Sequence, residues 1–438
     1  MVEACELSAL EARQQIKDGT LTSELLIQSC LDRIDRRSDE VGAWTFLDPE
    51  LALLSAINSD KTGNRGALGG LPVGIKDIID TNNMPTTYGS SIYGLNQPKR
   101  DAACVNYVKE HGGIVLGKTV TTEFAWRNPG KTKNPHNLEH TPGGSSSGSA
   151  AGVADFQMPL AFGTQTAGSI IRPASYCGVV GYKPSYGLIS RNGILKTSEK
   201  LDHMGVFGRS VEDVALLARV LIKKDNHDKA TIHYSSEDMF SETKKGPLFE
   251  PKFIFYKTDY WKLIDKKSRQ AFEYFIESFK KNIEVFDTPS YFKNIHKYHQ
   301  IIHETDLANN FSLYYKKYKK KLSKYMQDAI AKGNKHSAKE YAEAIDFMKR
   351  SYESYQEVFE DYHGVLSPSS PGVAPKGLKS TGTAEFNKVW SYLGTPCISL
   401  PVLQGEGNLP LGVQLIGARF DDHRFLGIAN WLEKECNK

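Results

Sequence analysis

The sequence Gly143-Gly144-Ser145-Ser146-Ser147-Gly148 opens a stretch that ends at Gly168-Ser169-Ile170-Ile171-Arg172-Pro173. Small and apolar residues fill the segment between them, 150–162. A Gly/Ser run is usually a flexible linker, but this one leads directly into Ala150-Ala151-Gly152-Val153-Ala154, which is typical of a tightly packed helix. Glycine beside serine also lets a backbone approach a ligand with N–H and hydroxyl groups pointing at it. The stretch therefore predicts a binding or catalytic site beside a buried helix.

Short motifs continue on both sides of this stretch. They are Gly69-Gly70-Leu71-Pro72-Val73-Gly74-Ile75-Lys76-Asp77, Thr164-Gln165-Thr166-Ala167-Gly168-Ser169, Cys177-Gly178-Val179-Val180-Gly181-Tyr182-Lys183-Pro184, Leu201-Asp202-His203-Met204-Gly205, Arg209-Ser210-Val211-Glu212-Asp213, Leu393-Gly394-Thr395-Pro396 and Pro410-Leu411-Gly412-Val413-Gln414-Leu415-Ile416-Gly417. With these motifs the chain resembles the amidase signature family of serine hydrolases. The likeness covers nearly the whole chain except about residues 225–360.

The resemblance implies a catalytic triad of two serines and a lysine. Ser169 matches the nucleophile, Ser145 the bridging serine and Lys76 the base, and the spacing of 24 residues between the serines agrees with the family. A serine hydroxyl needs a base to remove its proton, and a lysine can serve only in its neutral form. Burial without a paired carboxylate lowers a lysine pKa and supplies that form. The resemblance also implies a cis peptide bond between Gly144 and Ser145.

The sequence departs from the family pattern at two positions near the nucleophile. Gln165 stands where the family often has an acid, and Ala167 where it often has a second glycine. Neither change removes a backbone N–H group. We therefore expect an oxyanion hole from the N–H groups of Thr166, Ala167, Gly168 and Ser169. The two departures leave the subfamily and the substrate open.

Composition argues against several classes of protein. The chain has 438 residues, of which 40% are hydrophobic, enough for a substantial core. Its formal net charge of +4 provides no strong attraction to nucleic acid or anionic membranes. The six cysteines lack Cys-x-x-Cys spacing, which fits a reducing cytoplasm better than a disulfide scaffold or a zinc module. Because no apolar run approaches about 18 residues and no signal peptide is indicated, we expect a cytoplasmic protein without a membrane span.

The order of predicted elements favours one α/β domain over residues 1–438. Residues 6–37 show the periodicity of two amphipathic helices, the second entered after Thr22 as its N-cap. Short apolar stretches typical of buried strands occupy residues 72–76, 114–116, 398–402 and 412–416. We expect a central mixed β-sheet with helices on both faces, and the resemblance implies the same architecture.

Residues 225–365 differ in composition from the rest of the chain. They are rich in Lys, Tyr, Phe, Glu and His and contain few glycines. Helical periodicity runs through 272–279, 301–325 and 338–359, which predicts a helical insertion that caps the site. The insertion is expected to end in a rigid turn, Ser367-Pro368-Ser369-Ser370-Pro371-Gly372.

Two features of this insertion point weakly to other functions. His296, His299 and His303 fall at i, i+3 and i+7 and could share a helix face as metal ligands. Such a face is more often pocket lining or polar surface, and we expect no metal. The run from Tyr314 to Lys324 has six lysines interleaved with tyrosines, which more often forms a solvated helix face than a nucleic-acid site.

Two literal motif matches are contradicted by their context. Residues 112–119 satisfy the phosphate-loop pattern Gly-x4-Gly-Lys-Thr, but a helical segment precedes them and Ile114-Val115-Leu116 is itself the predicted strand. Residues 144–148 match the nucleophile elbow Gly-x-Ser-x-Gly, which needs a preceding apolar strand. Residues 137–142, which precede this match, form a loop in our interpretation. Neither nucleotide binding nor an elbow is expected.

The preferred function is hydrolysis of a small-molecule carboxylic amide to an acid and ammonia or an amine, through an acyl-enzyme and without a cofactor. Ester and carbamate cleavage stay open. The first alternative is the A subunit of glutamyl-tRNA(Gln) amidotransferase; Gln165, the modest length and Trp390-Ser391-Tyr392-Leu393-Gly394-Thr395-Pro396 weigh against it. The second is a non-catalytic binding protein on the same fold. A homodimer is left open, and no nucleic acid or membrane partner is expected.

Overall fold

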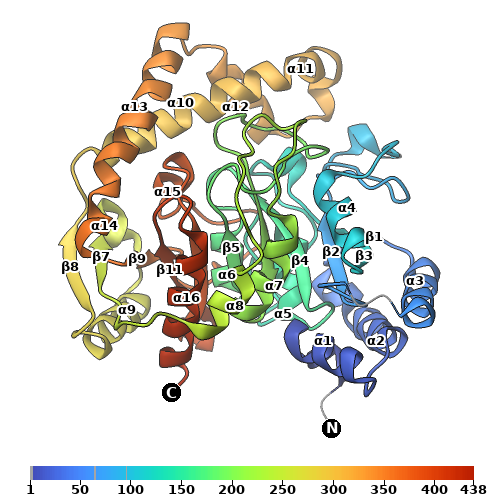
Figure 1. Ribbon diagram of the computed structural model, residues 1–438. Coiled ribbons are helices and arrows are strands. Elements are labelled where there is room, and N and C mark those ends of the chain that lie inside the picture. The colour runs from blue at the N-terminus through green and yellow to red at the C-terminus, as the bar shows by residue number, and fades with distance from the viewer. Residues whose placement is uncertain (1–2, 64–65, 95) are drawn as a thin grey trace.

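A computed structural model describes residues 3–63, 66–94 and 96–438 (Figure 1). In the described residues an 11-stranded sheet runs through the molecule in the order β1-β3-β2-β4-β6-β5-β10-β11-β9-β7-β8. Its strands are β1 Trp44–Leu47, β2 Pro72–Lys76, β3 Ile114–Thr119, β4 Leu160–Gln165, β5 Val180–Lys183, β6 His203–Gly208, β7 Phe253–Lys257, β8 Ile283–Asp287, β9 Gly364–Pro368, β10 Cys397–Gln404 and β11 Pro410–Ile416.

The sheet is mixed, as predicted. Strand β2 lies parallel to both of its neighbours, β3 and β4, and the pairs formed by β7 with β8 and β9 are also parallel. The strands between these two parallel groups, from β4 through β6, β5, β10 and β11 to β9, pair antiparallel. The parallel β3-β2-β4 group places the carboxyl ends of its strands at one edge, where the predicted site lies.

Helices flank this sheet and complete the α/β architecture (Figure 1). They are α1 Ala9–Asp18, α2 Ser23–Val41, α3 Pro49–Thr62, α4 Ala103–Glu110, α5 Ser147–Ala154, α6 Ile171–Cys177, α7 Val211–Leu221, α8 Met239–Lys245, α9 Lys266–Ser278, α10 Phe292–Asn310, α11 Ser312–Tyr318, α12 Lys324–Gly333, α13 Ala338–Gln356, α14 Val358–Asp361, α15 Lys388–Tyr392 and α16 Asp422–Cys436. Helices α5 and α6 pack together, and α7 packs with α8 and α16 in a second group. The predicted single α/β fold is confirmed.

Local signals in the sequence account for several of these elements. Thr22 caps α2, since its hydroxyl accepts a hydrogen bond from the Leu25 N–H at 3.1 Å. Strand β2 is buried at every position, as its apolar run predicts. Its Gly74 has no room for a side chain, because a Cβ there would lie 2.2 Å from the Met158 sulfur.

Helix α5 confirms that the Gly/Ser run leads into a tightly packed helix. All of its residues except Ala154 are buried. Gly148 lets the helix reach its neighbours, because a Cβ there would lie 2.1 Å from the Ala43 carbonyl oxygen and 2.4 Å from the Val120 nitrogen. The same residue donates its backbone N–H to the Val120 carbonyl at 2.9 Å. The small residues therefore serve close packing here, and the run is not a linker.

Residues 225–365 are largely helical but also contain β7, β8 and the first two residues of β9, strands that the sequence pattern did not predict. Strands β7, β8 and β9 extend the main sheet at one end. The stretch 301–325 is not one helix, because the chain breaks between α10, α11 and α12. Figure 1 shows α10, α11, α12 and α13 together above one edge of the sheet.

The expected rigid turn at 367–372 begins later than predicted. Ser367 and Pro368 belong to β9 and pair with Gln414 and Val413 of β11. Proline has no N–H to donate, so it is tolerated here at the last position of its strand. No helix of the described residues is long and apolar enough to cross a bilayer.

Candidate active site

Lys76 and Ser145 meet at the edge where the parallel strands end. Lys76 is the last residue of β2, and Ser145 lies in the loop that enters α5. The Lys76 Nζ lies 2.7 Å from the Ser145 Oγ and 2.7 Å from the Thr164 Oγ1 on neighbouring β4. The Gly144–Ser145 peptide is cis, as the resemblance implies. Two of the three expected triad residues are therefore in direct contact.

Burial keeps Lys76 away from its charged form. Its side chain is fully buried, and no carboxylate of the described chain forms an ion pair with it. Burial lowers the pKa of Lys76 well below its ordinary value, with only partial opposition from the charge of Asp202. The adjacent Asp77 does not neutralise it, because Asp77 pairs with Lys118 at 3.3 Å. A lysine in this setting can accept a proton.

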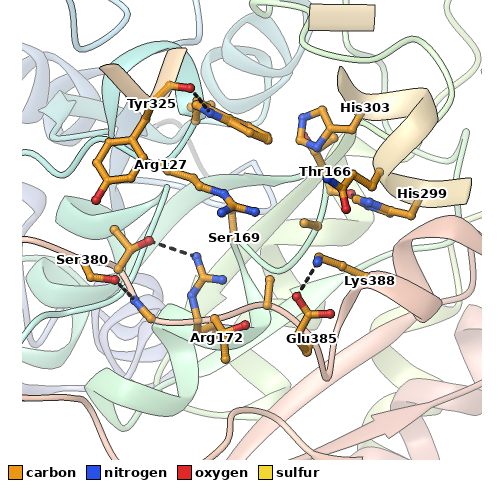
Figure 2. A pocket seen from close by; sticks show the side chains of 18 of the residues that line it. Arg127, Thr166, Ser169, Arg172, His299, His303, Tyr325, Ser380, Glu385 and Lys388 are labelled. Carbon is orange, nitrogen blue, oxygen red and sulfur yellow. Dashed lines mark hydrogen bonds and ion pairs between the residues drawn. The ribbon is translucent and has the colours of Figure 1, made fainter. Parts of the chain in front are cut away.

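Ser169 lies in the loop between β4 and α6 and lines a cavity of about 360 Å³ (Figure 2). It is only partly buried, whereas Lys76 and Ser145 are buried. Helix α10 contributes His299 and His303 to the lining of the cavity. Of the three residues expected to form the triad, Ser169 is thus the one that a molecule in the cavity would meet first.

The loop before Ser169 is anchored through its carbonyl groups. The Thr166 carbonyl accepts from the His299 Nε2 at 2.9 Å, the Ala167 carbonyl from the Ser391 hydroxyl at 2.8 Å, and the Gly168 carbonyl from the Arg172 N–H at 3.0 Å. In a trans peptide the N–H of the next residue points opposite to the carbonyl. The N–H groups of residues 167–169 therefore face the other way, and within the described part of the chain they donate to no protein acceptor.

This arrangement leaves three of the four N–H groups expected in the oxyanion hole without a protein acceptor in the described chain. The side chain of Thr166, the fourth residue, hydrogen-bonds the Asp202 carboxylate at 2.6 Å and the Thr197 hydroxyl at 3.0 Å. Asp202 also accepts from the Thr197 and Ser198 N–H groups, at 2.7 and 2.9 Å. A role of the Thr166 N–H in an oxyanion hole stays a prediction, as does the catalytic role of the other three groups.

Gln165 and Ser391 hold the same loop through hydrogen bonds. The sequence did not predict this arrangement. The Gln165 Oε1 accepts from the N–H groups of Ile170 and Ile171 at 2.9 and 3.0 Å, and its Nε2 donates to the Ser391 Oγ at 3.1 Å. Ser391 in turn donates to the Ala167 carbonyl. Gln165, a departure from the family pattern, and the 390–396 segment, which weighed for a stand-alone amidase, are therefore joined in one hydrogen-bonded unit.

The three histidines of α10 have other partners than a metal. His299 donates to the Thr166 carbonyl, His303 packs edge-on against Trp126, and His296 Nδ1 lies 3.0 Å from the Glu385 carboxylate. Burial lowers the pKa of His299 to about 3 and that of His303 well below its ordinary value. In the described residues no group of three His, Cys, Asp or Glu side chains is arranged to hold a metal ion.

The two literal motif matches lie in the contexts that the sequence suggested. Helix α4 precedes residues 112–119, and Ile114–Thr119 is strand β3, which leaves no open phosphate loop. No strand covers residues 137–142 before the elbow-like match. Lys118 of the first match is tied to the Ile79 carbonyl at 2.8 Å and to Asp77.

Adding one methyl group at Gly168 is expected to lower kcat/KM for any substrate of this site by about 10²- to 10³-fold, as loss of an oxyanion donor does. A Cβ at Gly168 would lie 2.4 Å from the Asn387 Oδ1. The Asn387 side chain cannot easily move away, because its Nδ2 donates a hydrogen bond to the Ser369 carbonyl at 3.0 Å. The matched control is Gly94→Ala, whose Cβ would meet only the Ser91 carbonyl oxygen, at 3.8 Å. Equal kinetics of both variants would contradict the prediction.

Known proteins share the sequence pattern and the fold of this chain. The Amidase family profile matches residues 25–426. The glutamyl-tRNA(Gln) amidotransferase A subunit of Halothermothrix orenii is 31% identical, with 100% of this chain and 98% of the relative covered. The corresponding protein from Thermotoga maritima has a solved structure with a TM-score of 0.82 and 29% identity, with 99% of this chain and 96% of that one covered.

A further solved structure shares the fold at a lower identity. It comes from a vestigial protein complex that reveals the origins of an s-triazine catabolic enzyme, and its TM-score is 0.91 at 24% identity, with 98% of each chain covered. The family profile and the 31% identical relative both span most or all of the sequence. The chain therefore belongs to the amidase signature family and is an amide-cleaving hydrolase.

Proposed function

We propose that the chain hydrolyses the C–N bond of a carboxylic amide through an acyl-enzyme on Ser169, with Lys76 as base and Ser145 as relay. The observation that carries the proposal is the 2.7 Å contact between the Ser145 hydroxyl and a buried lysine whose pKa is strongly lowered. A lowered pKa favours the neutral amine, which can act as a general base. The products are a carboxylic acid and ammonia or an amine, and no cofactor takes part.

In the proposed acylation, the Ser169 Oγ attacks the amide carbonyl carbon while its proton passes through the Ser145 hydroxyl to the Lys76 Nζ. The N–H groups of Ala167, Gly168 and Ser169 stabilise the oxyanion that develops. Lys76 returns the proton to the leaving nitrogen as the C–N bond breaks. In the second half of the reaction water attacks the ester, the same relay takes its proton, and Ser169 is regenerated.

A fluorophosphonate probe together with a panel of aliphatic and aryl amides tests this proposal. Labelling of one serine per chain, with turnover of at least one amide, is the expected result. A folded protein that neither reacts with the probe nor cleaves any amide would favour the non-catalytic binding protein instead. Intact-mass measurement of the labelled chain supplies the readout and gives the stoichiometry directly.

The second candidate is the A subunit of a glutamyl-tRNA(Gln) amidotransferase, which releases ammonia from glutamine for its partner subunits. The relative from Halothermothrix orenii carries that name and matches the whole chain, so sequence similarity favours this candidate over the stand-alone amidase preferred from the sequence. The Gln165–Ser391 hydrogen bond, which joins a departure from the family pattern to the segment that resembles stand-alone amidases, supports a separate branch.

Adding the B and C subunits and glutamyl-tRNA separates the two candidates. A stand-alone amidase is expected to cleave small amides at the same rate with or without them. An amidotransferase component should form a complex with them, and its glutaminase activity should rise strongly when they are present.

The interpretation of residues 225–365 as a cap that sets substrate choice, inserted in a single domain of residues 1–438, also stays part of the proposal.

A further inference from the structure

Charged side chains around the catalytic cavity are not all neutralised by one another. The cavity lining includes two carboxylates, Glu304 and Glu385. Glu385 forms an ion pair with Lys388 and lies 3.0 Å from the His296 Nδ1. Glu304 accepts from the Gln300 Nε2 at 2.9 Å and lies 3.1 Å from the His336 Nε2. Both acidic groups of the lining are therefore already engaged.

Two guanidinium groups of the same lining have no such partner. In the described chain no carboxylate forms an ion pair with Arg127 or Arg172. Arg172 is buried and structural, since its Nη2 donates to the Gly144 carbonyl at 2.6 Å. Arg127 is exposed to the cavity, and Figure 2 shows its guanidinium pointing inward near Ser169 and Arg172. An uncompensated positive charge thus lies beside the reacting serine.

Arg127 is held in this position by a rigid support. Its guanidinium lies 5.2 Å from the centre of the Trp126 ring. Trp126 is fixed in turn, because its Nε1 donates to the Tyr325 carbonyl at 3.1 Å and its ring meets His303 edge-on. A cation that is held in place before binding loses less entropy when it engages an anion.

The backbone before Arg127 is strained, which is common where a side chain is placed for function. Phe124 and Ala125, two consecutive residues that are not glycine, have φ values of 48° and 57°. Such a backbone conformation is costly for a residue with a side chain and persists only where its surroundings enforce it. Here the Phe124 N–H donates to the Tyr88 carbonyl at 2.8 Å, and the Trp126 N–H to the Glu123 carbonyl at 2.8 Å.

We propose that Arg127 is a specificity residue that binds a carboxylate of the substrate, so that the enzyme prefers amides that carry an acidic group. This inference rests on the proposed amide hydrolysis at Ser169. The preferred class comprises monoamides of dicarboxylic acids and other amides with a carboxylate a few bonds from the scissile carbonyl. Arginine suits this role because its planar donors match a carboxylate in a bidentate way.

A pair of substrates of equal length tests the proposal: glutaric acid monoamide and its neutral counterpart pentanamide. The quantity measured is the ratio of their kcat/KM values. We expect the wild-type enzyme to favour the acid, and Arg127→Gln to lower the ratio by about 10- to 100-fold, as loss of a charge-assisted hydrogen bond does. The loss should appear mainly in KM. Rising salt should also shrink the wild-type ratio, because it screens an exposed charge.

Arg350→Gln is the matched control, because Arg350 also lies over a neighbouring ring, Phe347, at 5.9 Å, but pairs with Asp346 on the surface. It should leave the ratio unchanged, and Arg127→Lys should restore part of it. A wild-type ratio near one, or an equal loss for both amides in Arg127→Gln, would overturn the assignment.

Calorimetry on Ser169→Ala protein measures the same preference as binding, without turnover. Tighter binding of the acidic amide that is lost when Arg127→Gln is added supports Arg127 even if neither amide is cleaved. Turnover and probe labelling at Ser169 without any acidic preference would leave the proposed hydrolysis intact and reject only this inference. Failure of labelling with retained acidic binding would reject the hydrolysis alone.

Discussion

Ser169→Ala is expected to lower kcat for amide hydrolysis by about 10⁴- to 10⁶-fold, the range seen when a catalytic serine nucleophile is removed. Of the three proposed triad residues, Ser169 is the one that lines the cavity, and it lies in the run of peptide N–H groups that lack a protein acceptor in the described chain. No acyl-enzyme can form once its hydroxyl is gone. Covalent labelling by a fluorophosphonate, read by intact mass, should disappear at the same time.

Ser146→Ala provides the control for this prediction. The Ser146 hydroxyl belongs to the same Gly/Ser cluster but contacts the Thr164 backbone, at 3.4 Å. Its loss should leave labelling in place and reduce turnover far less than Ser169→Ala does. If labelling persisted in Ser169→Ala and vanished in Ser146→Ala, the nucleophile would have to be reassigned to the elbow-like match at residues 144–148.

Ser145→Ala should fall between these two variants. It breaks the relay from Ser169 to Lys76 but keeps the nucleophile and the N–H donors in place. A water molecule can take the position of the missing hydroxyl and carry part of the proton transfer. We therefore expect a slower enzyme that is still labelled by the probe.

Much of the fold follows from local signals that the sequence displays. The strands at 72–76 and 412–416 are continuous apolar runs, and burial on both faces of a sheet produces that pattern. Strands β7 and β8 were not predicted, because they lie among Lys-rich helices and pair in parallel, β7 with both β8 and β9. Such pairing leaves no turn signal between the partners.

The candidate site, too, could be predicted only in part from the sequence. The resemblance alone suggested Lys76, Ser145 and Ser169, since the residue types by themselves leave a solvated Lys76 equally plausible. The anchors of the nucleophile loop were missed because they join residues far apart in the chain: Ser391 to Ala167, and His299 to Thr166. No local pattern encodes a contact between side chain and backbone across more than a hundred residues.

Replacement of Lys76 tests the proposed base, and the pH dependence fixes its protonation state. Burial lowers the pKa of Lys76 well below the ordinary value of about 10.4. The rate should rise with pH through that lowered pKa, because only the neutral amine accepts a proton. Lys76→Met should remove most activity at every pH. Lys76→Arg should not restore it, since a guanidinium stays charged at any working pH.

Stability supplies a second readout of the same lowered pKa. Between the pKa of Lys76 in the folded protein and about 10.4, the unfolded chain binds a proton that the folded chain does not. Stability that depends on this group therefore rises with pH across that window. Lys76→Met removes this titration. The melting temperature of the wild-type protein should therefore rise relative to that of the variant as pH increases. A Lys76→Arg enzyme with near-wild-type turnover would refute the mechanism and move the search for the base to His203, which is buried and hydrogen-bonded to the Leu201 carbonyl at 2.7 Å.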